Sequence, residues 1–199
     1  PGKNWHVTYC AKNKGQMRAN LKSHGLDSLW FAICCDKTDL EKFLDSVPYP
    51  CIVKPREGVA SQLVSLCYSR DDLEAQCVAA WKILPGQPLL VEEYIEGPLY
   101  TLETIGDAQN ICVLGGFKVK LSPPPNFIEL EASWGTGLTR EEEDEVINII
   151  RRYFEITIGR FGIRNSSNPV GYHHPSIQCH PDYPISFYYR LYLCVGVLA

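Results

Sequence analysis

Alternating apolar and polar positions along the chain predict helices interspersed with strands. Apolar residues at helical spacing predict four helices, which are residues 11–24, residues 38–47, a segment after Ser69, and a segment from Thr139 to about Gly159. Short β-rich runs predict strands over 51–55, 62–69 and 88–95, and two strands around a turn within 99–117. This order predicts an α+β fold with antiparallel pairing.

Two of the helix starts are specified by capping side chains. Ser69 is followed by Asp72 three residues later, and Thr139 is followed by Glu142 at the same distance. A hydroxyl and a carboxylate at this spacing can satisfy the free N–H groups of a first helical turn. We therefore expect these two helices to begin where the capping pairs lie.

Composition narrows the class of protein. The chain has 199 residues, 45% of them hydrophobic, and a net charge of −4, which favours a globular core and disfavours partners such as nucleic acid or an anionic membrane. Its nine cysteines contain no CxxC pair, and several lie in apolar runs. We interpret them as reduced, buried thiols of a cytoplasmic protein without a membrane span.

One stretch, "VKPREGVAS" at residues 53–61, indicates a binding site. Lys54 ends an apolar strand, and a loop of small residues follows it. A lysine at a strand end beside such a loop can hold a phosphate, since backbone N–H groups and the ammonium converge there. The alternative is a lysine that extends into solvent before an ordinary hairpin turn.

Further segments follow this stretch in a characteristic order. "LLVEEYIEGPLYTLE" occupies residues 89–103 and "SPPPNFIELEASW" occupies 122–134, while "NKGQMR" precedes both at 13–18. Together they resemble the ATP-grasp superfamily, in particular its carboxylate-amine ligases, over residues 10 to about 160.

The resemblance implies two lobes with antiparallel sheets and an ATP site between them. It divides the chain into four parts, which are an N-terminal helical lead-in (1–49), a small lobe with phosphate loop and hinge (50–97), part of a larger lobe (98–163) and an atypical tail (164–199). The family's preceding α/β domain and its last strands are then expected to lie outside this chain.

The resemblance also implies a role for individual residues. ATP phosphates would contact Lys14 and Lys54, with Arg18 beside Lys14, and the loop from Gly58 to Ser61 would close over them. Adenine would lie beside the hinge residues Glu92, Glu93, Tyr94 and Ile95. Lys118 and Lys120 would lie near phosphate or carboxylate during catalysis.

Each of these roles has a simpler alternative. Lys14 and Arg18 are four residues apart and can form a solvated cationic helix face. Glu92 and Glu93 alternate across a strand, so only one of them can face a ligand. Tyr94 can serve packing alone, and the proline-rich segment 122–131 can be a structural loop.

The chain departs from the family pattern in several places. Leu99 occupies the position of a ribose-binding glutamate, and the loop "EGVAS" has one glycine. Mg²⁺ is expected for the family, but its ligands are unknown here. The tail changes composition abruptly, as a truncation or a shifted reading frame would cause. Its His and Cys residues (His173, His174, Cys179 and His180) suit a zinc site by their chemistry, and the simpler alternative is a plain polar loop.

The resulting functional hypothesis is an ATP-dependent ligase that joins a carboxylate to an amine through an acyl phosphate. Its partners would be ATP and the two small-molecule substrates, with homodimer formation left open. Two alternatives remain, which are an ATP-binding module without catalysis and a plain α+β interaction domain.

Overall fold

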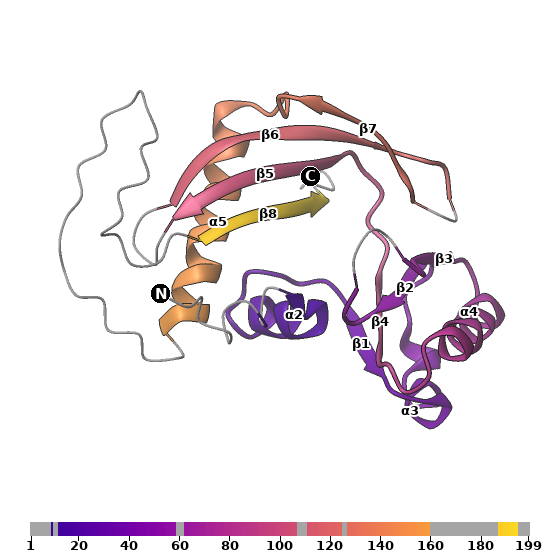
Figure 1. Ribbon diagram of the computed structural model, residues 1–199. Helices are drawn as coiled ribbons and strands as arrows, with labels where there is room; N and C mark the ends of the chain where they lie inside the picture. Colours follow the sequence, from indigo (N-terminus) through magenta and orange to yellow (C-terminus); the bar gives the residue numbers. More distant parts are fainter. Residues whose placement is uncertain are drawn as a thin grey trace.

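Two four-stranded antiparallel sheets form the body of the molecule (Figure 1). The computed structural model describes residues 9, 12–58, 62–106, 111–124, 127–159 and 187–194. The first sheet has the strand order β1-β4-β2-β3 and the second has the order β7-β6-β5-β8. This architecture confirms the α+β expectation with antiparallel pairing.

The first sheet is built from residues between 31 and 93. Its strands are β1 (Phe31–Cys34), β2 (Cys51–Pro55), β3 (Ser65–Cys67) and β4 (Leu89–Glu93), and its helices are α3 (Lys37–Glu41), a 3-10 turn (Leu44–Ser46) and α4 (Arg70–Ile83). Helices α3 and α4 pack on one face of this sheet (Figure 1). The buried core between them comprises Cys34, Leu40, Leu44, Val47, Cys51, Val53, Cys67, Leu73, Cys77, Ala80, Leu89 and Val91.

The strands of the first sheet alternate between this core and the opposite face. Cys51 and Val53 of β2 belong to the core with Leu89 and Val91 of β4. Successive side chains of a strand point to opposite faces, so Ile52, Lys54, Leu90 and Glu92 lie on the face away from α3 and α4. The candidate site is built on that second face.

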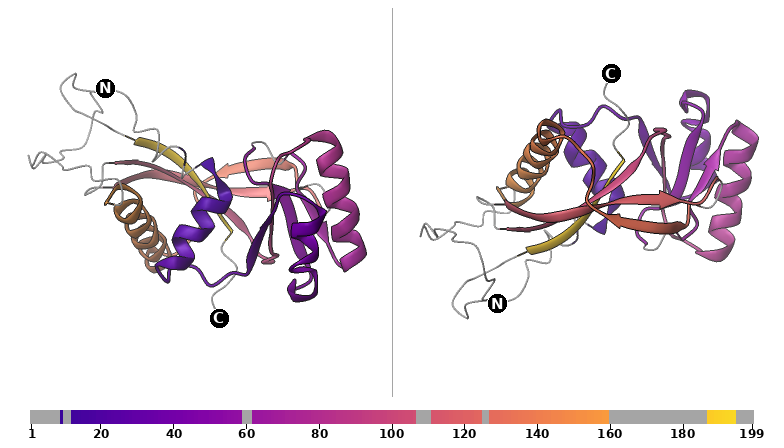
Figure 2. Two further views of the ribbon diagram at one scale, coloured as in Figure 1. Left: turned by 90° about the horizontal axis from the view of Figure 1, so that it is seen from below. Right: turned by 90° about the horizontal axis from the view of Figure 1, so that it is seen from above.

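The second sheet is built from the rest of the chain. Its strands are β5 (Leu99–Gly106), β6 (Ile111–Leu121), β7 (Glu129–Trp134) and β8 (Phe187–Cys194), and its helix is α5 (Arg140–Gly159). Helices α2 (Lys14–Ser23) and α5 touch each other and lie on the same side of this sheet (Figure 2). Among the α5 side chains that the structure describes, Val146, Ile150 and Tyr153 are buried.

Both predicted capping pairs are present. The Ser69 side chain accepts a hydrogen bond from the Asp72 amide at 3.2 Å. Thr139 and Glu142 cap each other, because each backbone N–H donates to the other side chain, at 2.7 and 3.3 Å. Helix α2 also ends as expected, with Gly25 at φ +66, a conformation that glycine adopts without steric cost.

Several boundaries differ from the sequence prediction, most clearly those of α3 and β3. The short helix α3 begins at Lys37 and is capped by the Asp36 side chain, which accepts from the Asp39 amide at 2.9 Å. The predicted helix over 38–47 was therefore too long, since a 3-10 turn replaces its second half. The strand predicted over 62–69 contains only Ser65–Cys67 in the sheet, although it forms the expected hairpin with β2.

Two segments outside the predicted lobes contribute strands. β1 comes from the segment assigned to the helical lead-in, and it pairs with β4. β8 comes from the tail 164–199 and pairs along the whole of β5. A run of apolar and aromatic residues has high β propensity, which explains why each joins the open edge of a sheet.

The cysteines of the first sheet agree with the expectation of buried thiols. Cys34, Cys51, Cys67 and Cys77 are free and buried, whereas Cys35 is free and exposed. Within the described residues, no helix has the length and apolar composition needed to cross a membrane.

Candidate functional site

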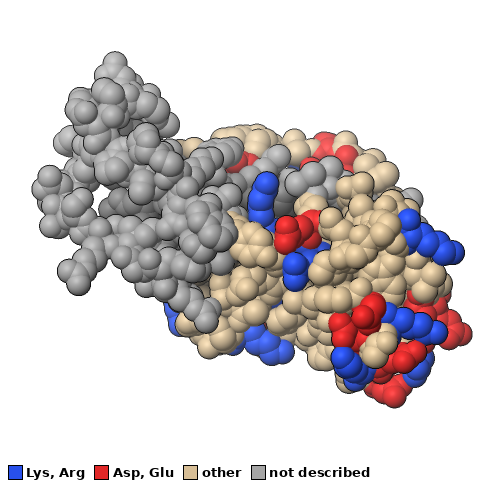
Figure 3. All heavy atoms as spheres, turned by 60° about the horizontal axis from the view of Figure 1, so that its bottom comes forward, with Lys and Arg blue, Asp and Glu red and all other residues tan. Residues whose placement is uncertain are grey.

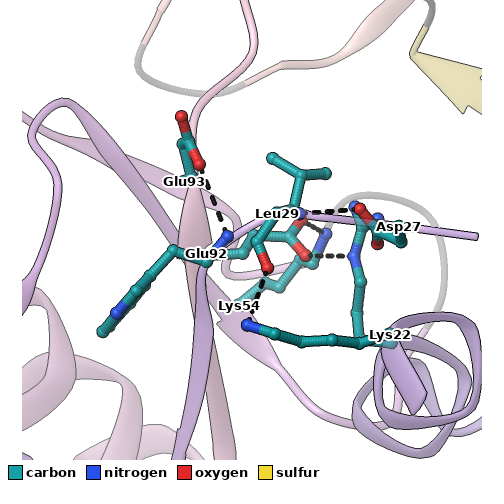
Figure 4. Close-up of polar contacts among 8 residues, drawn as sticks. Lys22, Asp27, Leu29, Lys54, Glu92 and Glu93 are labelled. Atoms are coloured by element: carbon teal, nitrogen blue, oxygen red, sulfur yellow. Dashed lines mark hydrogen bonds and ion pairs between the residues drawn. The ribbon is translucent and has the colours of Figure 1, made fainter. Parts of the chain in front are cut away.

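Lys54 and Glu92 meet on the open face of the first sheet. β2 and β4 run antiparallel with Ile52 opposite Glu92. Lys54 is two residues beyond Ile52, so it is a diagonal neighbour of Glu92 on the same face. Its ammonium forms an ion pair with Oε1 of Glu92 (Figure 4).

The structure separates the two adjacent glutamates. Glu92 is buried with 6% of its surface exposed, whereas Glu93 is exposed and accepts a hydrogen bond from the Trp30 amide at 3.4 Å. Burial alone raises the pKa of Glu92, but the charges of Lys54 and Arg18 outweigh it, so that its pKa lies below the ordinary 4.5. Glu92 is therefore the glutamate that faces the site, and it is ionised there.

Arg18 links helix α2 to the same carboxylate. Its Nε donates to Oε2 of Glu92 at 3.0 Å, and its Nη1 donates to Oδ2 of Asp27 at 2.6 Å. Burial lowers the pKa of Arg18, and the two carboxylates more than offset this, so that the pKa is raised. Arg18 is thus part of an alternating arrangement of charges rather than a solvated helix face.

Asp27 was not identified in the sequence. It lies in the connection between α2 and β1, and its Oδ1 accepts a hydrogen bond from the Leu29 amide at 2.9 Å (Figure 4). The only indication in the sequence is an acidic residue two positions after the helix-ending Gly25. An acidic residue in a turn is ordinarily solvent-exposed, and only the fold brings it to Arg18.

Lys14 lies at the start of α2 beside the candidate phosphate loop. Its ammonium donates to the Gly58 carbonyl at 2.9 Å, and its backbone N–H donates to the Arg56 carbonyl at 3.1 Å. Burial and the nearby Lys54 lower the pKa of Lys14, although Glu92 and Glu57 act in the opposite direction. The structure thus brings together Lys14, Lys54 and Gly58, while Ser61 lies outside the described residues.

The beginning of the loop is attached to α2 by a second contact. Nδ2 of Asn13, the N-cap residue of α2, donates to Oε1 of Glu57 at 2.9 Å. Gly15 permits this close approach, because a Cβ there would lie 2.7 Å from Ile33 and 3.3 Å from Arg56. The sequence predicts the loop, but only the fold reveals this attachment.

Together, Lys14, Arg18, Asp27, Lys54 and Glu92 form what we call the charge cluster. Three cations face two anions, and the side chains come from α2, the connection after it, β2 and β4. Figure 4 shows Asp27, Lys54 and Glu92 lying close together. One positive charge is left over, which makes the cluster suited to an anionic ligand.

The chain leaves the first sheet through Tyr94 and Ile95. The Tyr94 amide donates to the Pro50 carbonyl at 3.2 Å, and its ring lies 6.0 Å from that of Phe127. Phe127 belongs to the segment between β6 and β7, so the Tyr94 ring joins the two sheets. Tyr94 therefore has a packing role, which is the alternative that the sequence offered to a position beside adenine.

Lys118 and Lys120 are not bonded to the charge cluster within the described residues. Both are exposed on β6, opposite Ser133 and Glu131 of β7. Within the described part of the chain, neither forms an ion pair with a residue of the charge cluster. No ion pair among the described residues therefore links these two lysines to Lys14 or Lys54.

A metal site is not formed by the residues that the structure describes. Among them, no group of three or more His, Cys, Asp or Glu side chains could hold a metal ion. The Mg²⁺ expected from the family resemblance therefore has no fitting set of protein ligands among the described residues. The alternative zinc ligands of the tail, residues 173–180, lie outside the described residues.

Charges of both signs are intermixed on the face seen in Figure 3. A small group of cationic and anionic side chains lies near the middle of this face, and a larger mixed group lies at one end. Neither sign of charge dominates the described part of this face.

Comparison with known proteins identifies the family. The model of the ATP-grasp domain matches residues 11–119. A D-alanine–D-alanine ligase of Geobacillus thermodenitrificans is 33% identical over 91 residues, which are 46% of this chain and 24% of that protein. Another, from Chromohalobacter salexigens, is 26% identical over 157 residues, which are 74% of this chain and 48% of that protein. The chain thus spans less than half of either relative.

Solved structures agree on the fold. The L-amino acid ligase of Bacillus licheniformis superimposes with a TM-score of 0.64 at 24% sequence identity, over 82% of this chain and 36% of that one. The D-alanine–D-alanine ligase of Bacillus anthracis gives a TM-score of 0.61 at 18% identity, over 78% of this chain and 51% of that one. The match to the family model covers the charge cluster and both sheets up to β6, and the chain belongs to the ATP-grasp domain family.

Proposed function

We propose that the chain binds ATP at the charge cluster and forms the nucleotide-binding part of an ATP-dependent ligase that joins a carboxylate to an amine. The observation that supports this most directly is the convergence of Lys14, Lys54 and Gly58. These residues are separated by up to 44 positions in the sequence. Relatives described as D-alanine–D-alanine and L-amino acid ligases support the reaction class.

In this proposal the two lysines hold the ATP phosphates. Lys14 and Lys54 lie close enough for their repulsion to lower the pKa of Lys14, and the opposing effect of Glu92 is smaller. A triphosphate between them would remove this repulsion and draw Lys54 away from Glu92. The loop at Gly58, and beyond it Ser61, would then close over the phosphates.

Adenine would lie along the exit of β4. Glu92 and Glu93 end β4, Tyr94 and Ile95 lead on toward the second sheet, and Tyr94 contacts Phe127 across that connection. A base bound beside this segment would touch both lobes. Such a position places ATP between the sheets, with its phosphates toward Lys54.

The chemical step we propose is phosphoryl transfer to a substrate carboxylate. An oxygen of the carboxylate attacks the γ-phosphorus, the bond to the β-phosphate oxygen breaks, and ADP leaves. An amine then attacks the acyl phosphate, an amide forms, and inorganic phosphate leaves. Lysines near the transferring group act by electrostatic stabilisation and positioning rather than by covalent chemistry.

Lys118 and Lys120 are proposed to attract the carboxylate substrate. Both ammonium groups are exposed, and neither has an ion-pair partner among the described residues. They are therefore available to an anion that approaches the second sheet. Such an anion would be the acid that is joined to the amine.

Calorimetric titration of ATP into the purified chain tests the nucleotide site. We expect Lys54→Met to weaken ATP binding about tenfold or more, because it removes a charge-assisted contact to phosphate. The matched control is Lys37→Met, since Lys37 is an exposed lysine on α3 with a loose 4.0 Å contact to Glu41. Equal affinity of the Lys54 and Lys37 variants, or no ATP binding by the folded chain, would refute the site.

Catalysis needs a separate assay. ADP release from ATP with Mg²⁺ and mixtures of amino acids, dependent on both an acid and an amine, would support the ligase. ATP binding without such turnover would instead support a binding module.

A further inference from the structure

We propose that Arg18 is a positioning residue that keeps Glu92 neutralised when Lys54 transfers from Glu92 to a phosphate of the bound nucleotide. This inference rests on the proposed ATP site and concerns how that site changes partners. It also assigns Arg18 a role different from direct contact with ATP.

The two oxygens of Glu92 are held by different cations. Oε1 is paired with Lys54, and Oε2 accepts from Nε of Arg18 at 3.0 Å. Glu92 is the buried member of this set, since its side chain is 7% exposed while those of Lys54 and Arg18 are 19% and 22% exposed. The carboxylate therefore cannot compensate for a lost cation by turning to water.

Arg18 and Lys54 differ in how firmly they are held. Arg18 uses two separate nitrogens for two carboxylates, because Nη1 also donates to Asp27 at 2.6 Å. Asp27 is itself fixed, through the Leu29 amide at 2.9 Å. Within the described residues, the Lys54 ammonium is paired with Glu92 alone.

This difference decides which cation can move. Turning Arg18 toward a ligand would break two ion pairs, because Asp27 would lose its cation and Glu92 would keep Lys54 alone. Moving Lys54 breaks one ion pair, and Glu92 still has Arg18. A buried charge that loses all its partners is strongly unfavourable, so Lys54 is the cation that can leave and Arg18 is the one that stays.

Location on the chain agrees with this division. Lys54 is the second-last residue of β2 and lies four residues before Gly58 of the loop, whereas Arg18 lies one turn into α2, four residues beyond Lys14. Lys14 therefore faces the loop, and Arg18 faces Glu92. The same helix presents one cation toward the ligand and one toward the internal carboxylate.

A thermodynamic cycle with ATP as the probe separates positioning from direct contact. Arg18→Met is measured in the wild-type background and in the Glu92→Gln background. We expect Arg18→Met to weaken ATP binding about tenfold when Glu92 is present, because Glu92 then retains Lys54. In the Glu92→Gln background no anion retains Lys54, so Arg18→Met should change the affinity less than about twofold.

A matched control excludes a general effect of losing an arginine. Arg70 on α4 also pairs with two carboxylates, Asp45 at 2.5 Å and Glu74 at 3.1 Å, but its side chain is 50% exposed. Arg70→Met should leave ATP affinity unchanged. Circular dichroism of every variant confirms that the measured proteins are folded.

The pH dependence of ATP binding gives a second readout. In the Arg18→Met variant, Glu92 takes up a proton when Lys54 leaves, so ATP binding should strengthen from pH 8 to pH 5.5 more than in Arg70→Met. Both variants experience the same protonation of ATP itself. If Glu92→Gln does not fold, this comparison decides the question, and if Arg18→Met does not fold, the uncharged Arg18→Gln replaces it in the cycle.

The outcomes distinguish this inference from the proposed function. Equal losses from Arg18→Met in both backgrounds, without the added pH dependence, would overturn the positioning role and leave the ATP site standing. Absence of ATP binding by the wild-type chain would overturn the ATP site, and the positioning role with it.

Discussion

At the scale of single residues, the charge cluster shows how a buried carboxylate is kept ionised. Glu92 has 6% of its surface exposed and is held between Lys54 and Arg18. The adjacent Glu93 has the same chemistry but is exposed. A difference of one position along a strand thus decides whether a glutamate is a surface charge or part of the site.

This arrangement predicts a pH-dependent stability. The pKa of Glu92 is lower in the folded chain than its ordinary value of 4.5, so its stabilising contribution is complete above that value and is lost as the pH falls through the folded pKa. We expect the free energy of unfolding to fall from pH 5 to pH 3 less steeply in Glu92→Gln than in the wild type. Urea denaturation at several pH values measures this.

Glu92→Gln should also lower the free energy of unfolding at neutral pH. Removing one partner of a buried ion-paired set leaves Lys54 and Arg18 undercompensated, so Glu92→Gln should lose about 3 kcal/mol at pH 7. Glu93→Gln is the matched control on the same strand and should change little. Equal pH slopes for the wild type and Glu92→Gln would show that Glu92 titrates alike in the folded and unfolded chain.

At the scale of elements, local sequence determined most helix and strand positions. The strand 51–55 and the long helix after Thr139 were predicted with the observed bounds or close to them. Capping and propensity act within a few residues, so a sequence can specify them. Elements that depend on distant partners were missed or misplaced, as β1 and the short β3 show.

The capping pair at the start of α5 gives a prediction at this scale. Thr139→Ala removes the hydroxyl that accepts from the Glu142 amide at 3.3 Å and should destabilise the chain by about 1 kcal/mol. Thr139→Ser retains the hydroxyl and should therefore lose much less stability. Thermal unfolding of the wild type and the two variants tests the cap. Equal stabilities of the alanine and serine variants would contradict it.

At the scale of the whole molecule, each sheet includes a strand from outside the lobe predicted for it in the sequence. β1 pairs with β4 in the first sheet, and β8 pairs with β5 in the second. Helices α2 and α5 touch on the same side of the second sheet. The charge cluster, which draws on α2 as well as on β2 and β4, therefore depends on how elements of both sheets are packed.

Removing β8 should affect one sheet and spare the other. In a chain ending at residue 186, the β5 amides that bond to β8 lose their partners, and the edge of the sheet opens. We expect hydrogen exchange to accelerate within Leu99–Gly106 and to stay unchanged within Cys51–Pro55. Unchanged exchange in Leu99–Gly106 would mean that β8 does not protect β5.

The sequence by itself determined the α+β class, the strand that carries Lys54, the loop after it and the resemblance to the ATP-grasp family. These follow from patterns within a few residues or from motifs in a fixed order. Only the tertiary structure decided that Glu92 rather than Glu93 faces the site, that Asp27 joins it, and that Arg18 is bound to two carboxylates. The physical reason is that strand register and helix docking bring together charges up to 74 positions apart, and neither is encoded in local patterns.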